Sequence, residues 1–116
     1  MTSEELARDC ARMLVEKHAQ DVRILDLRGL TDIADFFVIA SANSQPHMKT
    51  LAETIEDFLV ECKIEKYHIE GIRGMKWVLV DMFDIIIHIF LPDIREFYDI
   101  ESYWGDAEAT LVGNGD

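Results

Sequence analysis

Asp81 and Asp84, followed four residues later by His88, are the side chains whose types and spacing come nearest to a chemical site. Paired carboxylates beside a histidine are typical of sites that bind a divalent metal or exchange protons. A metal-dependent phosphoryl-transfer site also needs amides that cradle phosphate, and the nearest candidate is the loop 41–44 ahead of an expected helix. That loop holds no lysine, and the sequence has no GxGxxG or GxxxxGK motif. We therefore expect Ser44 to act as the helix N-cap only.

The histidines do not have the spacing of a metal site, because each falls on a separate expected element: His18, His47, His68 and His88. We expect His18 and His47 to be solvated residues at helix ends, and His68 to lie on the surface of a strand. His88 has two interpretations, a half-buried histidine with its hydrogen bonds satisfied or a contact with a partner.

The composition indicates one acidic globular domain. Its 116 residues are 49% hydrophobic, which is enough for one packed core. The formal net charge of −12, from 23 acidic and 11 basic residues, argues against a direct grip on nucleic acid, which needs clustered Lys and Arg. The charge favours a basic protein partner, although acidity is also a general solubility trait.

Several features predict a cytoplasmic protein without cofactor, metal or membrane contact. Cys10 and Cys62 fall on apolar helix stripes and fit small buried residues better than a disulfide or a metal pair. The N-terminus is acidic and helical, unlike a signal or transit peptide. The longest apolar run, residues 85–87, is far too short to span a bilayer.

The spacing of apolar residues predicts alternating helices and strands. A first helix is expected over residues 4–17, capped by Thr2 or Ser3, with Glu5 at capping-box spacing from Thr2. Strands are expected over residues 22–27, 35–42 and 67–70, followed by a β-hairpin over residues 76–90. The continuous apolar run in 35–42 indicates a strand covered on both faces.

Two further helices follow from the same reasoning. One begins after Ser44 and carries an apolar stripe of Met48, Leu51, Ile55, Phe58 and Cys62. The other is expected over residues 94–104, with Asp93 and Glu96 at capping-box spacing and Gly105 as its C-terminal stop. One stripe of this last helix contains Ile94, Phe97, Glu101 and Trp104.

The hairpin has two faces that alternate along its strands. A two-residue turn at Met82 and Phe83 pairs Asp81 with Asp84, Leu79 with Ile86 and Trp77 with His88. Those residues share one amphiphilic face. The opposite face is purely aliphatic and is expected to be core: Val78, Val80, Ile85, Ile87 and Ile89. Phe83 is an unfavourable turn residue, because such turns prefer Gly or Asn where φ is positive.

The order of helix, two strands, helix, three strands and helix predicts a single α/β domain over residues 1–107, with a mixed sheet of about five strands flanked by helices. Residues 108–116 are expected to form a flexible acidic tail, because the segment has no periodicity and contains two Gly.

The outer face of the hairpin and the last helix are suited to binding a protein. Trp and Tyr are the usual anchors of interfaces, with Arg as their charged companion. The candidate contacts are Trp77, Arg95 and Tyr98, bordered by Asp81, Asp84 and Glu101. Alternatively, Trp77 covers the sheet edge, Tyr98 fills the core, and Arg95 braces Glu101 or Asp84 internally.

Ordered motifs run through most of the chain. They are Asp26-Leu-Arg-Gly29, Asp35-Phe-Phe-Val-Ile, Ser44-Gln-Pro-His47, Trp77-Val-Leu-Val-Asp81, Asp84-Ile-Ile-Ile-His88-Ile-Phe90 and Arg95-Glu-Phe97-Tyr98-Asp-Ile-Glu101-Ser-Tyr-Trp104. In this order they resemble the signature of the ribosomal silencing factor family, also called Iojap, across residues 6–107. Phe83 departs from the pattern, which usually has a small or polar residue there, often Gly.

The resemblance implies a fold related to nucleotidyltransferases without their catalytic carboxylates, and hence a protein that is not an enzyme. It implies binding to the large ribosomal subunit through ribosomal protein fourteen, at the face where the small subunit docks. Such factors block subunit joining sterically and repress translation when nutrients are scarce, and they also form homodimers away from the ribosome. Carried over residue by residue, the partner-binding positions are Trp77, Asp81, Asp84, His88, Arg95, Tyr98 and Glu101.

Two other functions stay open at this point. A divergent nucleotidyltransferase-like enzyme would use Asp81 and Asp84, and would bind a metal ion between them. A pure dimerisation module would instead cover the amphiphilic face with a second copy of the chain.

Overall fold

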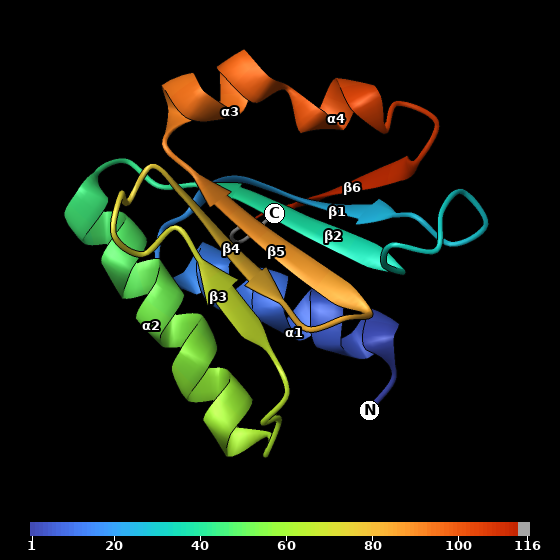
Figure 1. The fold of residues 1–116 in the computed structure, drawn as a ribbon, viewed down its shortest axis with the longest axis horizontal. Coiled ribbons are helices and arrows are strands. Elements are labelled where there is room, and N and C mark those ends of the chain that lie inside the picture. Colours follow the sequence, from blue (N-terminus) through green and yellow to red (C-terminus); the bar gives the residue numbers. More distant parts are fainter. Residues whose placement is uncertain (114–116) are drawn as a thin grey trace.

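In the computed structural model, which describes residues 1–113, helices pack on both sides of a six-stranded sheet (Figure 1). The elements are α1 (Ser3–Glu16), β1 (Gln20–Asp26), β2 (Phe36–Ser41), α2 (Gln45–Glu61), β3 (His68–Glu70), β4 (Trp77–Asp81), β5 (Ile85–Phe90), α3 (Pro92–Tyr98), α4 (Ile100–Tyr103) and β6 (Glu108–Val112). The strand order is β3-β4-β5-β2-β1-β6. β2 and β5 run parallel and the other neighbours are antiparallel, so the sheet is mixed, as predicted. Within the described residues, no helix combines the length and apolar character needed to cross a membrane.

The two long helices begin where the sequence predicts. The Thr2 hydroxyl accepts a hydrogen bond from the Glu5 amide (3.1 Å), and the Glu5 carboxylate accepts one from the Thr2 amide (3.3 Å). These two bonds complete the capping box of α1. At the start of α2, the Ser44 hydroxyl accepts a hydrogen bond from the His47 amide (3.2 Å). Each cap satisfies amides that have no partner inside the helix, which determines where the helix begins.

The sheet has two covered faces of different character. α1 and α2 pack on one, the α1–α2 face, against buried strand residues that include Val22, Ile24, Val38, Val78, Val80, Ile85, Ile87 and Ile89. α3 and α4 pack on the other, the α3–α4 face, against Leu25, Phe37, Ile39, Ile86 and Phe90. Because both faces are covered at the centre, every residue of β2 and β5 is buried. This confirms the predicted burial of the second strand on both sides.

Both cysteines are free: Cys10 lies in α1 within the core of the α1–α2 face, and Cys62 is the C-cap residue of α2. Cys10 is fully buried, and its burial raises the pKa of the thiol to about 12. It therefore behaves as a small hydrophobic residue, as predicted. Cys62, at the C-terminal end of α2, is only partly buried.

The register of the hairpin differs from the prediction by two residues. β4 and β5 pair Trp77 with Phe90, Leu79 with His88 and Asp81 with Ile86. The Met82 amide donates to the Ile85 carbonyl (2.8 Å), so Phe83 and Asp84 form the turn. Because a shift of two preserves the alternation of side chains, the predicted faces are confirmed although the predicted partners are wrong. Asp81 and Asp84 consequently do not oppose each other across the hairpin.

The predicted helix over residues 94–104 is wrong in its continuity. α3 ends at Tyr98, and Asp99, with φ of 45°, separates it from α4. A residue in the left-handed region interrupts the helical hydrogen-bond pattern. The expected capping box of Asp93 and Glu96 is also absent, because α3 begins two residues earlier, after Leu91, whose side chain makes no capping hydrogen bond.

A sixth strand corrects the expectation of a tail without regular structure. β6 pairs antiparallel with β1, so that Leu25 faces Ala109 and Arg23 faces Leu111. β6 is an outer strand, and four of its five residues are exposed, which explains why it carries no hydrophobic alternation. The last part of the expected tail, residues 114–116, lies outside the described residues.

Candidate functional site

The α3–α4 face is only partly covered by its helices. Burial decreases across this face from Ile86 and Phe90 on β5, which are buried, through Leu79 and Asp81 on β4, to the exposed His68 and Glu70 on β3. We call the uncovered part the open strip, which consists of His68, Glu70, Trp77, Leu79 and Asp81. Antiparallel pairing sets His68 opposite Asp81 and Glu70 opposite Leu79, which brings these side chains together on one face.

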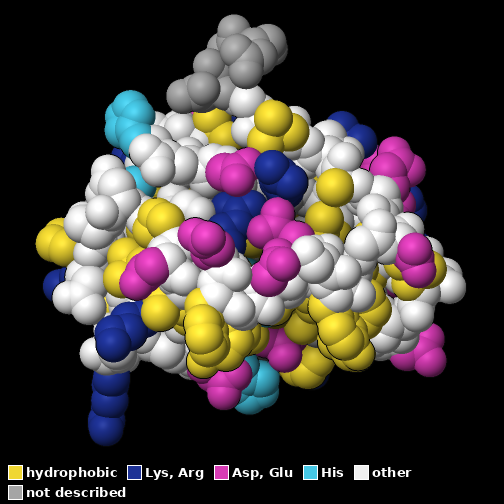
Figure 2. Space-filling model, turned by 90° about the horizontal axis from the view of Figure 1, so that it is seen from above, with side chains coloured by type: hydrophobic (Ala, Val, Ile, Leu, Met, Phe, Trp, Pro, Cys, Tyr) yellow, Lys and Arg dark blue, Asp and Glu magenta, His cyan; other side chains and the backbone are white. Residues whose placement is uncertain are grey.

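Aromatic rings gather at one end of the open strip. The Trp77 ring lies 4.8 Å from the Phe90 ring and 4.9 Å from the Tyr98 ring, measured between centroids. Tyr98 is 53% exposed, and Phe97, whose ring meets it edge-on, is 79% exposed. Figure 2, which looks down on α3 and α4, shows hydrophobic side chains at the rim of this face with Asp and Glu beside them. The structure therefore leaves Tyr98 and Phe97 accessible and Trp77 half-buried behind them.

The exposure of Phe97 differs from the prediction, which places it on the apolar stripe of one helix over residues 94–104. On such a helix Phe97 shares a stripe with Ile94 and Trp104, both of which do pack in the core of the α3–α4 face. In the structure the buried residue of α3 is Arg95, and Phe97, two positions further on, points to solvent. The break at Asp99 separates α3 from Trp104, so the predicted stripe does not continue along one helix. Among the expected partner contacts, Trp77 and Asp81 thus belong to the open strip, and Tyr98 of α3 lies against Trp77 at one end of it.

His88 lies inside the molecule, which corrects its expected contact with a partner. Its side chain is 5% exposed, and the Trp77 indole Nε1–H donates a hydrogen bond to its Nδ1 (3.2 Å). This bond leaves the imidazole proton on Nε2, which is buried without a hydrogen-bond partner among the described residues. Burial lowers the pKa of His88 to about 4, opposed weakly by the charge of Asp81, so the ring is neutral near neutral pH.

Arg95 and Glu101 form an internal brace. The guanidinium Nε and Nη2 donate to the two carboxylate oxygens of Glu101 (2.8 and 3.1 Å), and Nη1 donates to the Ser41 hydroxyl (2.8 Å). Arg95 is 8% exposed, and Asp21 and Arg23 of β1 lie within 3.8 and 3.6 Å of the pair. This bidentate ion pair connects α3 with α4, and the bond to Ser41 connects α3 with the end of β2. The alternative that Arg95 braces Glu101 internally is therefore confirmed, and its expected contact with a partner is corrected. Figure 2 shows Lys and Arg side chains at the centre of this face, ringed by Asp and Glu.

The two aspartates do not form a chemical pair. The Asp81 carboxylate accepts a hydrogen bond from the Phe83 amide (2.8 Å), so it stabilises the turn. Asp84 is exposed within the turn, and its carbonyl accepts hydrogen bonds from the amides of Asp35 and Phe36 (2.8 and 3.2 Å). Across residues 1–113, no three side chains of His, Cys, Asp or Glu converge as metal ligands.

The loop before α2 is occupied by its own hydrogen bonds. The His47 amide donates to Ser44, and the Asn43 amide donates to Nδ1 of the His47 ring (3.0 Å). The ring proton is therefore on Nε2, which donates to the carbonyl of Lys17 at the end of α1 (2.8 Å). His47 is thus a connector between two helices, and its expected place as a solvated residue is wrong. The amides of Asn43 and His47 already have partners, which weakens the loop as a phosphate cradle.

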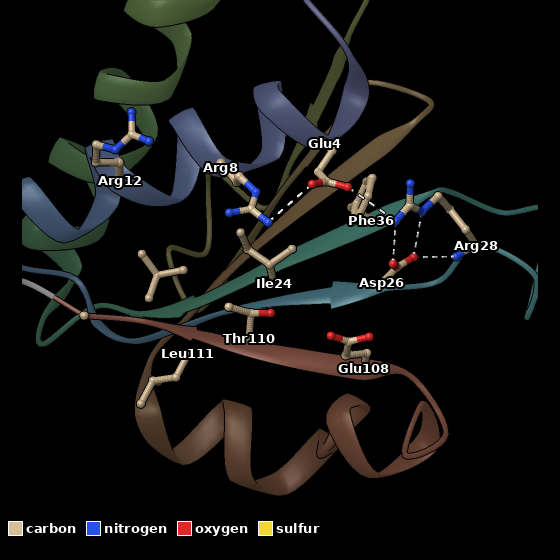
Figure 3. A pocket seen from close by; sticks show the side chains of 12 residues that line it. Glu4, Arg8, Arg12, Ile24, Asp26, Arg28, Phe36, Glu108, Thr110 and Leu111 are labelled. Atoms are coloured by element: carbon tan, nitrogen blue, oxygen red, sulfur yellow. Dashed lines mark hydrogen bonds and ion pairs between the residues drawn. The ribbon is translucent and has the colours of Figure 1, made fainter. Parts of the chain in front are cut away.

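A separate hollow of about 480 Å³ lies on the opposite side of the sheet, between α1 and β6 (Figure 3). Four of its charged groups pair with one another: Arg28 contacts Asp26 (2.7 Å) and Glu4 (3.3 Å), and Arg8 contacts Glu4 (3.3 Å). The hydrogen bond from Arg28 holds the pKa of Asp26 below its usual value. None of the seven expected partner-binding residues lines this hollow.

Comparisons of the sequence and of the structure with known proteins point to the same family. The family model described as "Ribosomal silencing factor during starvation" matches residues 1–115. The chain is 35% identical over 107 residues to the Ribosomal silencing factor RsfS of Bacillus subtilis, covering 92% of this chain and 91% of that protein. A crystal structure of a protein from Chromobacterium violaceum matches with a TM-score of 0.86 at 30% identity, covering 100% of this chain and 98% of that one. The murine protein named Mitochondrial assembly of ribosomal large subunit protein 1 is 28% identical over 95 residues, covering 79% of this chain and 42% of that protein.

Proposed function

Because the chain belongs to the family of ribosomal silencing factors, we propose that it binds the large ribosomal subunit through ribosomal protein fourteen and blocks association with the small subunit. The block is steric, since a protein docked at the joining face occupies space that the small subunit needs. Translation is thereby repressed in the cytoplasm when nutrients are limited, and the protein catalyses no reaction. The names of the relatives support the ribosomal part of this proposal, one as a silencing factor and one as an assembly factor of a large subunit.

The open strip is the observation that carries the proposal. It presents the half-buried Trp77 at one end, where Tyr98 of α3 lies beside it, and the carboxylate of Asp81 at the other. Aromatic anchors bordered by polar groups are typical of the energetically important centre of an interface. A net charge of −12 complements a basic ribosomal protein, so Asp81 and the exposed Asp84 are assigned to meet Lys or Arg on it.

The buried members of the predicted set act from beneath this surface. His88 orients the indole of Trp77 through its hydrogen bond. Arg95 and Glu101 hold α3 against the sheet, and α3 carries Tyr98. These three residues position the contacts and do not touch the partner.

The enzyme hypothesis is not favoured by the geometry of its two acids. Catalysis by two carboxylates requires both to converge on one metal ion or one proton. Asp81 is engaged with the turn amide, and Asp84 is a turn residue on the other side of Phe83.

Co-sedimentation of the protein with purified large subunits tests the proposal. Tyr98→Ala and Trp77→Ala should each weaken binding by about 2 kcal/mol, or roughly thirtyfold, because each removes an aromatic anchor. Tyr103→Ala is the matched control, since Tyr103 is 80% exposed on α4. Repeating the series at higher ionic strength should weaken the wild-type complex, as expected for charge-driven docking. Unchanged binding by both variants would reject the open strip, and a wild-type protein that does not sediment would reject the function.

A further inference from the structure

Phe83 combines a strained backbone with an exposed side chain. It lies at the turn between β4 and β5 with φ of 71° and is 56% exposed. The turn between the paired Met82 and Ile85 contains only Phe83 and Asp84, and a two-residue hairpin turn requires positive φ in this way. Gly and Asn adopt this conformation readily, whereas a bulky side chain is strained there.

Contacts within the protein do not explain why a phenylalanine occupies this position. Its amide is held by the Asp81 carboxylate, a bond that any residue other than proline would make equally well. Its ring meets the His68 ring edge-on at 6.2 Å between centroids, and His68 is itself exposed. The adjacent Met82, in contrast, is 7% exposed and belongs to the core of the α1–α2 face. The strain at Phe83 is therefore not offset by burial in the folded monomer.

The position of Phe83 links it to the open strip. His68 and Asp81 face each other across β3 and β4, and Phe83 touches both, one through its ring and the other through its amide. Trp77 begins β4, which ends at Asp81, and Phe83 lies two residues beyond that end. The four residue steps of the strand alone correspond to about 13 Å. The open strip thus has Trp77 at one end and Phe83 next to its other end. The carboxylates of Glu70 and Asp81 belong to the strip, and that of Asp84 is next to Phe83 in the turn.

We propose that Phe83 is a second anchor of the partner-binding surface, and that its ring enters an apolar recess rimmed by Lys or Arg on the same basic protein. This inference rests on the proposed function. The acidic groups around Phe83 select the occupant: Asp81 and Asp84 lie on either side of it in the chain, and Glu70 follows on β3. An anionic lipid surface or a nucleic-acid backbone would be repelled there, whereas a cationic protein surface is attracted. Residues with a strained backbone conformation, as at Phe83, are concentrated at functional sites such as binding surfaces.

The test separates stability from binding, because binding should weaken while stability is kept or increased. Phe83→Gly and Phe83→Asn relieve the strained backbone, so the midpoint of thermal unfolding should stay the same or rise. Affinity for purified large subunits, measured by co-sedimentation, should fall at least about tenfold for both variants. Phe83→Tyr retains an aromatic ring and should bind within about threefold of the wild type. Val60→Ala is the control for an exposed apolar side chain, since Val60 is 70% exposed on α2, and it should change neither quantity.

Four results overturn the inference, and only the last of them also rejects the proposed function. If the wild type binds and Phe83→Gly and Phe83→Asn bind equally well, Phe83 is not an anchor, while the proposed function stands. If both variants unfold at clearly lower temperature, the ring is a packing residue of the monomer. If the variants abolish only self-association, measured by sedimentation velocity, the occupant is a second copy of the chain. A wild-type protein that does not bind the subunit at all rejects the proposed function together with this inference.

Discussion

The two faces of the sheet are built from the same strands and from different kinds of side chain. On β5, Ile85, Ile87 and Ile89 point to the α1–α2 face, and Ile86, His88 and Phe90 point to the α3–α4 face. The buried polar side chains of residues 1–113 all lie on the α3–α4 face: Ser41, His88 and Arg95. The α1–α2 face is covered by two long helices, whereas α3 and α4 are short and leave the open strip uncovered.

This difference separates the stabilising side of the molecule from the side that positions functional groups. An aliphatic face is stabilised by burial alone and needs no matching of polar partners. Buried polar groups lower stability unless they are hydrogen-bonded, so they persist where they orient other residues. On the α3–α4 face they orient Trp77 and hold the helix that carries Tyr98.

The largest expected effect is on the free energy of unfolding, when the same Ile→Ala substitution is made on each of the two faces. Ile87→Ala should lower the free energy of unfolding by about 4 kcal/mol, because it leaves a cavity in a sealed core. Ile86 precedes Ile87 on the same strand and points to the other face. Ile86→Ala should lower the free energy of unfolding by about 2 kcal/mol, because the short helices that cover the α3–α4 face can relax into the cavity. Both are buried, at 0% and 8% exposure, and chemical denaturation measures both losses. Equal losses would contradict the contrast between the faces.

The next effect concerns the brace of the α3–α4 face. Arg95→Ala should lower the free energy of unfolding by about 3 kcal/mol, because it removes both hydrogen bonds to the carboxylate of Glu101 and the one to the hydroxyl of Ser41. The double variant Arg95→Met with Glu101→Gln should recover most of that loss, since the unpaired charge is gone. Arg8→Ala, which removes an exposed ion pair on α1, is the control and should change stability little. An Arg95→Ala protein as stable as the control would show that the brace is not structural.

The smallest of these effects is a pH dependence of the free energy of unfolding, which we attribute to His88 on the α3–α4 face. The folded state holds the pKa of His88 at about 4, below the ordinary value of 6.5, so between these values the unfolded chain binds more protons. The contribution of the neutral His88 ring to the free energy of unfolding is complete above about pH 6.5 and is lost as the pH falls towards 4. Lowering the pH from about 7 to about 5 should therefore reduce the free energy of unfolding by about 2 kcal/mol. Denaturation of wild type and of His88→Phe at the two pH values measures it. The variant should lack this part of the dependence, and an unchanged dependence would show that another group causes it.

Much of the fold was predictable because its signals are local. The caps at Thr2 and Ser44 depend on residues three positions apart, and both were confirmed. The two faces of the hairpin depend only on alternation, which is why they were correct in spite of a register shifted by two. β6 and the break at Asp99 were missed, because an exposed edge strand has no apolar pattern and a non-glycine residue at positive φ has no reliable sequence signal.

The candidate site divides in the same way. Sequence reasoning identified the segment and the types of its residues, including Trp77, Asp81 and Tyr98. It could not separate those at the surface from His88 and Arg95, which are buried by packing between distant elements. It also missed His68 and Glu70, because their place in the open strip depends on the pairing of β3 with β4.

The chain by itself determined the class of fold, the acidic charge, the aliphatic core of the hairpin and the family, since each follows from composition, short-range spacing or ordered motifs. Tertiary structure alone decided which polar groups are accessible and which serve as internal supports. The physical reason is that exposure and hydrogen-bond partnership depend on what packs around a residue. Arg95 is enclosed because α3 and α4 fold back onto the end of β2, whereas α3 reaches β4 only at Trp77 and leaves the outer residues of β3 exposed.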